Sequence, residues 1–141
     1  LPFLLGTAGD TIPGDTPYLE APEIHALNIE DRTKTSVGIV WAGRPTHKND
    51  TNRTLSVETI LPLCDLPNTQ FYSIQVGVGS KDICDIPNII DLSSNLVDFA
   101  ATAAIINQLD IIISVDTAVA HLAGALNKEC WVLLPYAPDW R

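Results

Sequence analysis

The chain of 141 residues is 46% hydrophobic and 18% charged, with a formal net charge of −9 at pH 7. This length fits one domain around a single core, and the composition is that of a folded globular chain. Because nucleic acid and anionic membranes repel a strongly acidic chain, both are excluded as main partners. Any anion-binding site must therefore arise from a local concentration of positive charge.

The chain carries no signal for a membrane or for secretion. Its apolar stretches fall short of the roughly 18 residues that a membrane-spanning helix needs, and its start, LPFLLGTAGD, has neither a basic segment nor an initiating Met. Cys64, Cys84 and Cys130 lie in or beside apolar runs without a metal-binding spacing. We expect no membrane span, a cytoplasmic location, buried free thiols, and a fragment of a longer protein.

The N-terminal third of the chain changes character near residue 36. Residues 1–35 are rich in Pro and Gly, which predicts a linker or the end of a preceding domain without regular elements. The run SVGIVWAG at 36–43 predicts a buried strand that ends in a turn of small residues. After a polar loop, the spacing in LSVETILPLCDL predicts a short helix that is capped by Ser56 and is kinked or ended near Pro62.

The middle of the chain predicts two strands and a helix. QFYSIQV indicates a strand at 70–76 and NIIDLS a short strand at 88–93, with at most one helical turn between them. In LVDFAATAAIINQLD we expect a helix that is capped by Asp98. The apolar stripe of this helix would contain Phe99, Ala103 and Ile106.

The last part continues the alternation. IIISV predicts a strand at 111–115, TAVAHLAGALN a helix at 117–127, and CWVLLP a strand at 130–135. Strands that alternate with helices over short connections predict an α/β fold with a doubly wound, Rossmann-like parallel sheet over residues 36–141.

Three polar residues interrupt the apolar run IIISVDTAVAHLAGAL: Asp116, Thr117 and His121. At about 100° per residue, Thr117 and His121 lie within about 40° of each other on the helix, away from its apolar face. They follow a strand at a helix N-terminus, where free amide groups and a partial positive charge favour phosphate. The alternative is that Asp116 or Thr117 only caps the helix, and that His121 is simply exposed.

A positively charged loop follows the first strand. GRPTHKNDTNRTL contains Arg44, Lys48 and Arg53, although the whole chain has only 8 Lys and Arg. The carboxyl ends of parallel strands lie at one edge of a sheet, so this loop and the 115/116 turn could face one crevice and hold a diphosphate. Gly43 would let a ligand approach the backbone closely. The alternative is a solvated charged loop.

Longer stretches resemble a known family. VGIVWAGRPTHKNDTNRTLSVETILPL, FYSIQVG and DFAATAAIINQLDIIISVDTAVAHLAGALNKECWVLLPYAPDWR look like the C-terminal half of the GT-B glycosyltransferases that follow tetratricopeptide repeats in bacterial proteins. They are similar to heptosyltransferases and, more distantly, to O-linked N-acetylglucosamine transferase. The resemblance covers residues 36–141, and residues 1–35 resemble the end of the acceptor-side domain.

This resemblance implies the nucleotide-diphospho-sugar-binding half of an inverting glycosyltransferase without a metal or other cofactor. Its partners would be the nucleotide-sugar donor, an acceptor-side domain and tetratricopeptide repeats, and the domain would be truncated at its C-terminus. Asp116, Thr117 and His121 match the family's D-T-x-x-x-H motif, and Ala118-Val119 stand where many heptosyltransferases have Gly-Pro. The candidate substrate-binding residues are Gly43, Arg44, Lys48, Arg53, Gln75, Asp116, Thr117, Ala118 and His121.

The catalytic base of such enzymes belongs to the other half, so we expect the fragment to bind a nucleotide or its sugar conjugate weakly and to be inactive alone. One alternative is a non-catalytic nucleotide-binding or protein-interaction module attached to the repeats. Another is a different Rossmann-like enzyme that binds a dinucleotide at GVGSKD (77–82), although this stretch lacks the third glycine and the following helix of that motif. The sequence does not name the base, the sugar or the acceptor.

Overall fold

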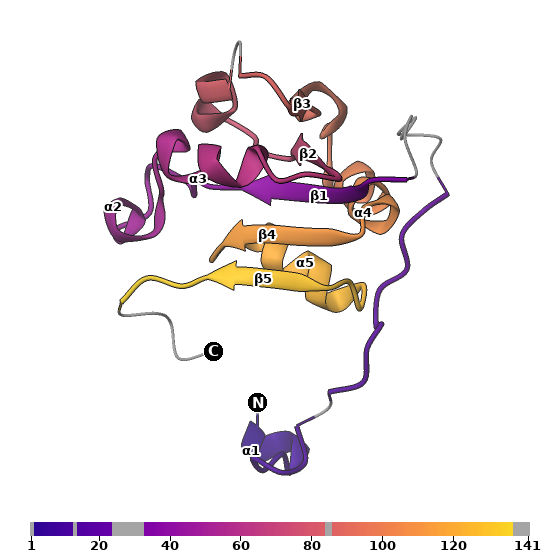
Figure 1. Ribbon diagram of the computed structural model, residues 1–141. Coiled ribbons are helices and arrows are strands. Elements are labelled where there is room, and N and C mark those ends of the chain that lie inside the picture. The colour runs from indigo at the N-terminus through magenta and orange to yellow at the C-terminus, as the bar shows by residue number, and fades with distance from the viewer. Residues whose placement is uncertain (1, 13, 24–32, 84–85, 137–141) are drawn as a thin grey trace.

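The structure is a computed structural model that describes residues 2–12, 14–23, 33–83 and 86–136. Its centre is a five-stranded, all-parallel sheet in the order β3-β2-β1-β4-β5 (Figure 1). The strands are β1 (Thr35–Val40), β2 (Thr69–Ser73), β3 (Ile89–Asp91), β4 (Ile111–Val115) and β5 (Cys130–Leu133). The expected α/β, Rossmann-like parallel sheet is confirmed.

Helices cover both faces of the sheet. On one face, α4 (Phe99–Gln108) and α5 (Ala118–Ala125) pack against the strands (Figure 1). On the other face lie α3 (Val57–Cys64) and the 3-10 helix η1 (Val78–Ile83). A second short 3-10 helix, η2 (Ser93–Asn95), precedes α4.

The central strand β1 is buried on both sides, as a parallel strand between two helical layers must be. Ile39 and Trp41 pack in the core cluster that includes residues of α3, whereas Val40 belongs to the cluster that includes α4 and α5. Gly38 faces the second cluster, where an added Cβ would lie only 2.7 Å from Leu109 Cδ1. A side chain at this position would therefore collide with the core.

Two short helices lie where the sequence predicts irregular chain. The expectation that residues 1–35 contain no regular element is wrong at α1 (Pro2–Leu5), which begins with a proline, a residue well suited to the first helical position. The polar loop after β1 contains α2 (Asp50–Arg53), whose single turn is closed by a hydrogen bond from Thr54 N to Asp50 O (2.8 Å). Figure 1 shows α1 apart from the sheet and α2 beside its carboxyl edge.

Several predicted boundaries shift. β1 ends at Val40 and β2 at Ser73, earlier than expected, because the two strands diverge at the carboxyl edge. The helix α3 contains Pro62 and ends at Cys64, two residues further on, in agreement with the expected end near this proline. Between β2 and β3 the chain forms six residues of 3-10 helix, which at about three residues per turn is two turns, not one.

The helix α4 is confirmed, with one correction. The Asp98 side chain caps it by accepting a hydrogen bond from Ala101 N (2.7 Å). Ala103 and Ile106 are buried as expected, but Phe99 is 64% exposed and does not belong to the core. As the first residue of the helix, Phe99 lies at the carboxyl edge of the sheet instead of over it.

The segment before β1 contacts the end of α5. The backbone N–H groups of Tyr18 and Leu19 both donate to Ala125 O, at 3.0 and 3.2 Å. Ala21 packs against the core cluster of α4 and α5. These contacts anchor part of the predicted linker to the sheet domain, at the end of α5 away from the carboxyl edge of the strands.

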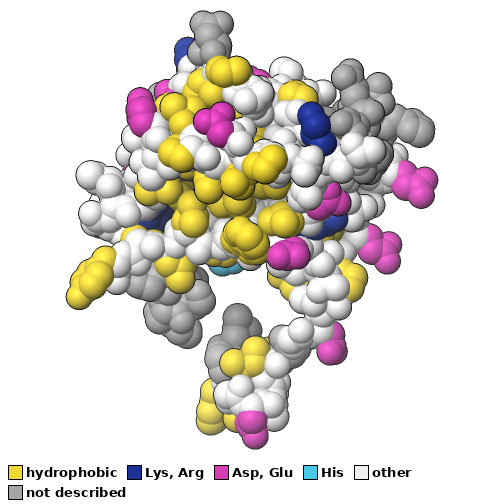
Figure 2. Space-filling model, in the orientation of Figure 1, with side chains coloured by type: hydrophobic (Ala, Val, Ile, Leu, Met, Phe, Trp, Pro, Cys, Tyr) yellow, Lys and Arg dark blue, Asp and Glu magenta, His cyan; other side chains and the backbone are white. Residues whose placement is uncertain are grey.

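Other expectations concern the surface and the thiols. None of the helices in the described part of the chain has the length and apolar character that a membrane span requires. Figure 2 shows hydrophobic side chains gathered in a band across the visible face. Cys64 is buried and Cys130 half-buried, both as free thiols whose pKa is raised by burial. Cys84 lies outside the described residues.

Candidate functional site

The strand order fixes where a ligand crevice can form. From β1 the chain builds one side of the sheet through β2 and β3, and then the other side through β4 and β5. The loops after β1 and β4 therefore leave the sheet in opposite directions and open a crevice at its carboxyl edge, as in other open parallel sheets. A cavity of about 490 Å³ lies there.

Four segments line this cavity. The loop after β1 contributes Gly43, Arg44 and Arg53, and the start of α5 contributes Thr117 and Ala118. The chain after β2 and the start of α4 provide the remaining wall, which is largely apolar. That wall includes Ile74, Val76, Leu96, Phe99 and Thr102.

The loop after β1 is tied down at both of its ends. Leu55 N donates to Trp41 O (2.8 Å), and Gly43 N donates to the Thr54 hydroxyl (3.0 Å). The residues that enter the loop thus bind the residues that leave it. This closure holds Arg44 and Arg53 near the carboxyl end of β1.

Arg53 links the loop to the junction of β4 and α5. Its Nη1 donates to the backbone carbonyl of Asp116 at 2.9 Å, and its Nη2 lies 3.6 Å from Asp50 Oδ1. The Arg53 and Asp50 side chains are only 13% and 15% exposed. Arg53 Nε and Asp50 Oδ1 are both buried without a hydrogen-bond partner among the described residues, so the two side chains are held as an ion pair and not by a hydrogen bond.

Gly43 makes room for this ion pair. A Cβ at Gly43 would lie 2.6 Å from both Arg53 Nη2 and Asp50 Oδ1. The pair therefore packs against the backbone of Gly43, which has no side chain. The sequence suggested that glycine is needed here for a ligand to approach, whereas the structure shows that it is needed for this ion pair to fit.

The start of α5 is not capped by the side chains that were considered for that role. Thr117 is the N-cap residue, but its hydroxyl lies 3.0 Å from the Ser114 hydroxyl and makes no capping bond. The backbone N–H groups of Ala118 and Val119 begin the helix and have no intrahelical acceptor. A helix tip without a side-chain cap, next to a buried guanidinium, is suited to an anion.

The side chains of Asp116, just before the N-cap of α5, and of His121, on α5, lie beside each other. His121 Nε2 is 3.9 Å from Asp116 Oδ1, and the His121 side chain is exposed. Neither residue lines the cavity. On the α5 side the cavity is lined instead by Thr117, Ala118 and Val119.

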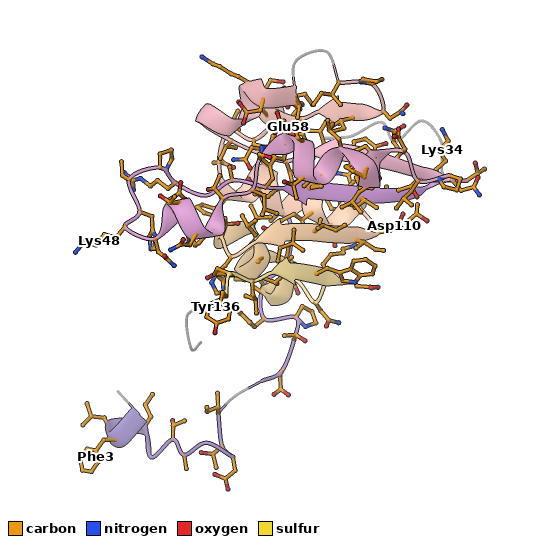
Figure 3. All side chains as sticks on the ribbon, turned by 60° about the vertical axis from the view of Figure 1, so that its left-hand side comes forward. Phe3, Lys34, Lys48, Glu58, Asp110 and Tyr136 are labelled. Atoms are coloured by element: carbon orange, nitrogen blue, oxygen red, sulfur yellow. The ribbon has the colours of Figure 1, made fainter. Side chains whose placement is uncertain are left out.

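The nine candidate residues thus divide into six that line the cavity and three that do not. Six of them line the cavity: Gly43, Arg44, Arg53, Gln75, Thr117 and Ala118. The other three do not line it: Asp116 lies between β4 and α5, His121 lies on α5, and Lys48 is exposed in the loop after β1, where Figure 3 shows it pointing away from the sheet. The predicted meeting of the loop after β1 and the β4–α5 turn is confirmed by the hydrogen bond from Arg53 to Asp116.

The sequence reasoning missed the apolar wall and Asp98. Val76 and Phe99 are exposed hydrophobic residues that flank the cavity, and Asp98 borders it while capping α4. Phe99 could not be recognised from its spacing, because the same spacing fits a core-facing stripe. The described residues contain no group of three or more His, Cys, Asp or Glu that could hold a metal ion.

Comparisons with protein-family profiles, with curated proteins and with solved structures gave no match.

Proposed function

We propose that the chain is the nucleotide-diphospho-sugar-binding domain of an inverting, metal-independent glycosyltransferase of the cytoplasm. In this proposal the diphosphate of the donor lies between the loop after β1 and the start of α5. The observation that carries the proposal is the 2.9 Å hydrogen bond from Arg53 Nη1 to Asp116 O, which joins the two segments at one wall of the crevice. The free thiols of Cys64 and Cys130 agree with a reducing compartment.

The charges and donors of this wall support a phosphate ligand. Arg53 donates from Nη1 to the Asp116 carbonyl and lines the cavity, and a planar guanidinium can bind phosphate through paired hydrogen bonds. Arg44 is exposed beside the same cavity. The amides of Ala118 and Val119 add backbone donors and the positive end of the helix dipole.

The opposite wall supports a nucleoside. Ile74, Val76, Leu96 and Phe99 offer an apolar surface to a flat base, and Asp98 offers a carboxylate to hydroxyl groups. The cavity of about 490 Å³ lies within the range of roughly 300–1,000 Å³ found for small-molecule sites. A cationic end and an apolar end in one crevice fit a molecule that is itself anionic at one end and aromatic at the other.

The reaction that follows from this arrangement is the displacement of a nucleoside diphosphate from the anomeric carbon by an acceptor hydroxyl. The bond from that carbon to the leaving phosphate oxygen breaks as the new bond to the acceptor oxygen forms, which inverts the configuration. Arg53, Arg44 and the helix amides would stabilise the charge that develops on the leaving diphosphate. An acceptor-side domain, preceded by tetratricopeptide repeats, would supply the base that takes the hydroxyl proton.

The test is a titration of the ¹⁵N-labelled chain with UDP, ADP, GDP and their sugar conjugates, followed by NMR. The proposal predicts shifts at residues 43–53 and 115–121 for one of these nucleotides. It also predicts that Arg53→Gln weakens binding about 10-fold to 100-fold, because a charged hydrogen bond contributes about 1.5–3 kcal/mol. Lys81→Gln is the matched control, since it removes the same charge from an exposed side chain of η1, outside the cavity.

The outcomes separate the alternatives. Shifts at the crevice with a specific loss in Arg53→Gln support the donor-binding domain. The absence of chemical-shift changes with every nucleotide contradicts the donor-binding domain and favours a non-catalytic interaction module. Tight dinucleotide binding that shifts residues 77–82, and that Lys81→Gln abolishes, favours a different Rossmann-like enzyme.

A further inference from the structure

Gln75 lies at the point where β1 and β2 separate. The pairing of the two strands ends at Ile39 and Ser73, and the last backbone hydrogen bond between them runs from Ile74 N to Ile39 O (3.1 Å). One residue further on, the Gln75 side chain turns toward the end of β1 and is buried, with 2% exposure. It borders the cavity on the β2 side.

The carboxamide of Gln75 makes hydrogen bonds with the backbone at the end of β1, where β1 and β2 are too far apart to pair with each other. Its Oε1 accepts hydrogen bonds from Trp41 N (3.2 Å) and Ala42 N (3.0 Å). Its Nε2 donates to Ala42 O (3.1 Å) and Val76 O (3.0 Å). A side-chain amide thus pairs with the backbone as a further peptide group of β2 would.

These four bonds exhaust the group. A glutamine side chain has two N–H donors and a carbonyl oxygen with two lone pairs, and each of them is engaged by the backbone. A phosphate or hydroxyl that bound Gln75 would have to displace one of these partners and leave a buried backbone group unpaired. Direct ligand contact by Gln75 is therefore unfavourable.

The backbone that Gln75 holds is the base of the cationic loop. Trp41 also accepts from Leu55 N, and Gly43, the next residue after Ala42, binds Thr54 and contacts the Arg53–Asp50 pair. Both ends of the loop therefore converge on the residues that the Gln75 carboxamide fixes. η1 packs over this arrangement, since a Cβ at Gly79 would lie 3.3 Å from Gln75 Nε2.

We propose that Gln75 is a positioning residue: its carboxamide braces the diverging ends of β1 and β2, and it acts on the phosphate site only through the loop that carries Arg53. The brace itself is a property of the free protein. Its effect on a ligand rests on the proposed function.

The first test needs no ligand. The chain has only three glutamines, at 70, 75 and 108, so selective ¹⁵N labelling of glutamine gives three carboxamide signals that can be followed separately. We expect the Gln75 amide protons to exchange with water far more slowly than those of Gln70, whose side-chain bonds are exposed or partly buried. Equal exchange rates for Gln75 and Gln70 would overturn the proposal, whatever the chain binds.

The second test uses the nucleotide that shifts the wild-type spectrum. At saturation the two Gln75 carboxamide protons should still exchange slowly with water and should keep the difference between their chemical shifts. The Arg53 guanidinium signal, in contrast, should shift. Gln75→Glu keeps the shape but replaces both donors by an oxygen facing two carbonyls, so it should shift Gly43 and Thr54 and weaken binding about tenfold or more. Loss of protection at Gln75 on binding would mean direct contact and would overturn the proposal.

A milder variant guards against misfolding. In Gly79→Ala the added Cβ would lie 3.2 Å from Ala42 Cβ and 3.3 Å from Gln75 Cδ and Nε2. It therefore presses on the carboxamide and on the residue that the carboxamide holds, without removing either, and it should shift the Gln75, Gly43 and Thr54 signals together. Gly124→Ala, with nothing near its added Cβ, is the control. If Gly79→Ala moves the Gln75 signals and leaves Gly43 and Thr54 unchanged, the brace does not act on the loop. Failure of every nucleotide to bind would refute the proposed function, whereas the exchange data and Gly79→Ala would still decide on the brace.

Discussion

Gly43 offers a strong single-residue test of how the cationic loop is seated. In Gly43→Ala the new Cβ would lie 2.6 Å from Arg53 Nη2 and from Asp50 Oδ1, and 3.2 Å from Arg53 Cζ. Carbon atoms do not approach buried polar atoms this closely, so the ion pair has to move. Arg53 would then lose its 2.9 Å hydrogen bond to Asp116 O.

The magnitude follows from that bond. Loss of a charged hydrogen bond costs about 1.5–3 kcal/mol, and the lower backbone entropy of alanine in the unfolded state returns about 0.4–1 kcal/mol. We expect Gly43→Ala to lower the free energy of unfolding by about 1–2 kcal/mol. For a domain of this size, that is a fall in Tm of about 3–8 °C.

The assay combines thermal unfolding with the nucleotide titration. Gly124→Ala is the matched control, because its added Cβ meets nothing within 4 Å and it lies in α5. Alanine there should raise stability by about 0.5–1 kcal/mol and leave nucleotide binding unchanged. If Gly43→Ala behaves like Gly124→Ala in both measurements, the reasoning about the Arg53–Asp50 pair is refuted.

Three further predictions concern the core, the end of α4 and the thiols. In Gly38→Ala the added Cβ would lie 2.7 Å from Leu109 Cδ1. This overpacking should lower the free energy of unfolding by about 1–3 kcal/mol and with it the urea midpoint. An unchanged midpoint would contradict the packing of α4 on β1. Lys128 Nζ donates to two backbone carbonyls at the end of α4, so Lys128→Met should speed amide exchange in the last turn of α4 and cost about 1–2 kcal/mol, whereas unchanged exchange would exclude this capping role. Burial raises the pKa of the Cys64 and Cys130 thiols above the ordinary 9.0, so they favour the folded state fully below pH 9 and lose that contribution as the pH rises through the folded pKa values. Denaturant unfolding at pH 8 and pH 10 should show this fall, and faster labelling of Cys64 than of half-buried Cys130, measured by mass spectrometry, would contradict the burial.

The sheet could be predicted from the sequence because buried parallel strands consist of short runs of apolar residues. SVGIV and IIISV became β1 and β4, and Asp98 capped α4 as its position before the apolar run indicated. The edge of the sheet that carries the site also followed, since parallel strands put their carboxyl ends together. These features depend on local periodicity and on topology.

The direction of individual side chains could not be predicted in the same way. Phe99 fits the apolar stripe of α4 by spacing but is the first residue of the helix and lines the cavity. Gln75 was a candidate for ligand binding, and its engagement with Trp41 and Ala42 depends on where β1 and β2 diverge. Lys48 and Arg53 belong to one loop, yet only Arg53 turns inward, because it forms an ion pair with Asp50 and donates a hydrogen bond to the Asp116 carbonyl.

The most direct measurement of the central claim is a crystal structure of the chain with the nucleoside diphosphate that binds best among UDP, ADP and GDP. The account predicts phosphate oxygens within about 3.2 Å of the Arg53 guanidinium and of the Ala118 and Val119 amides, with the base against Val76 and Phe99. A diphosphate bound away from this crevice, or bound in it with the phosphates at the Phe99 end, would contradict the account.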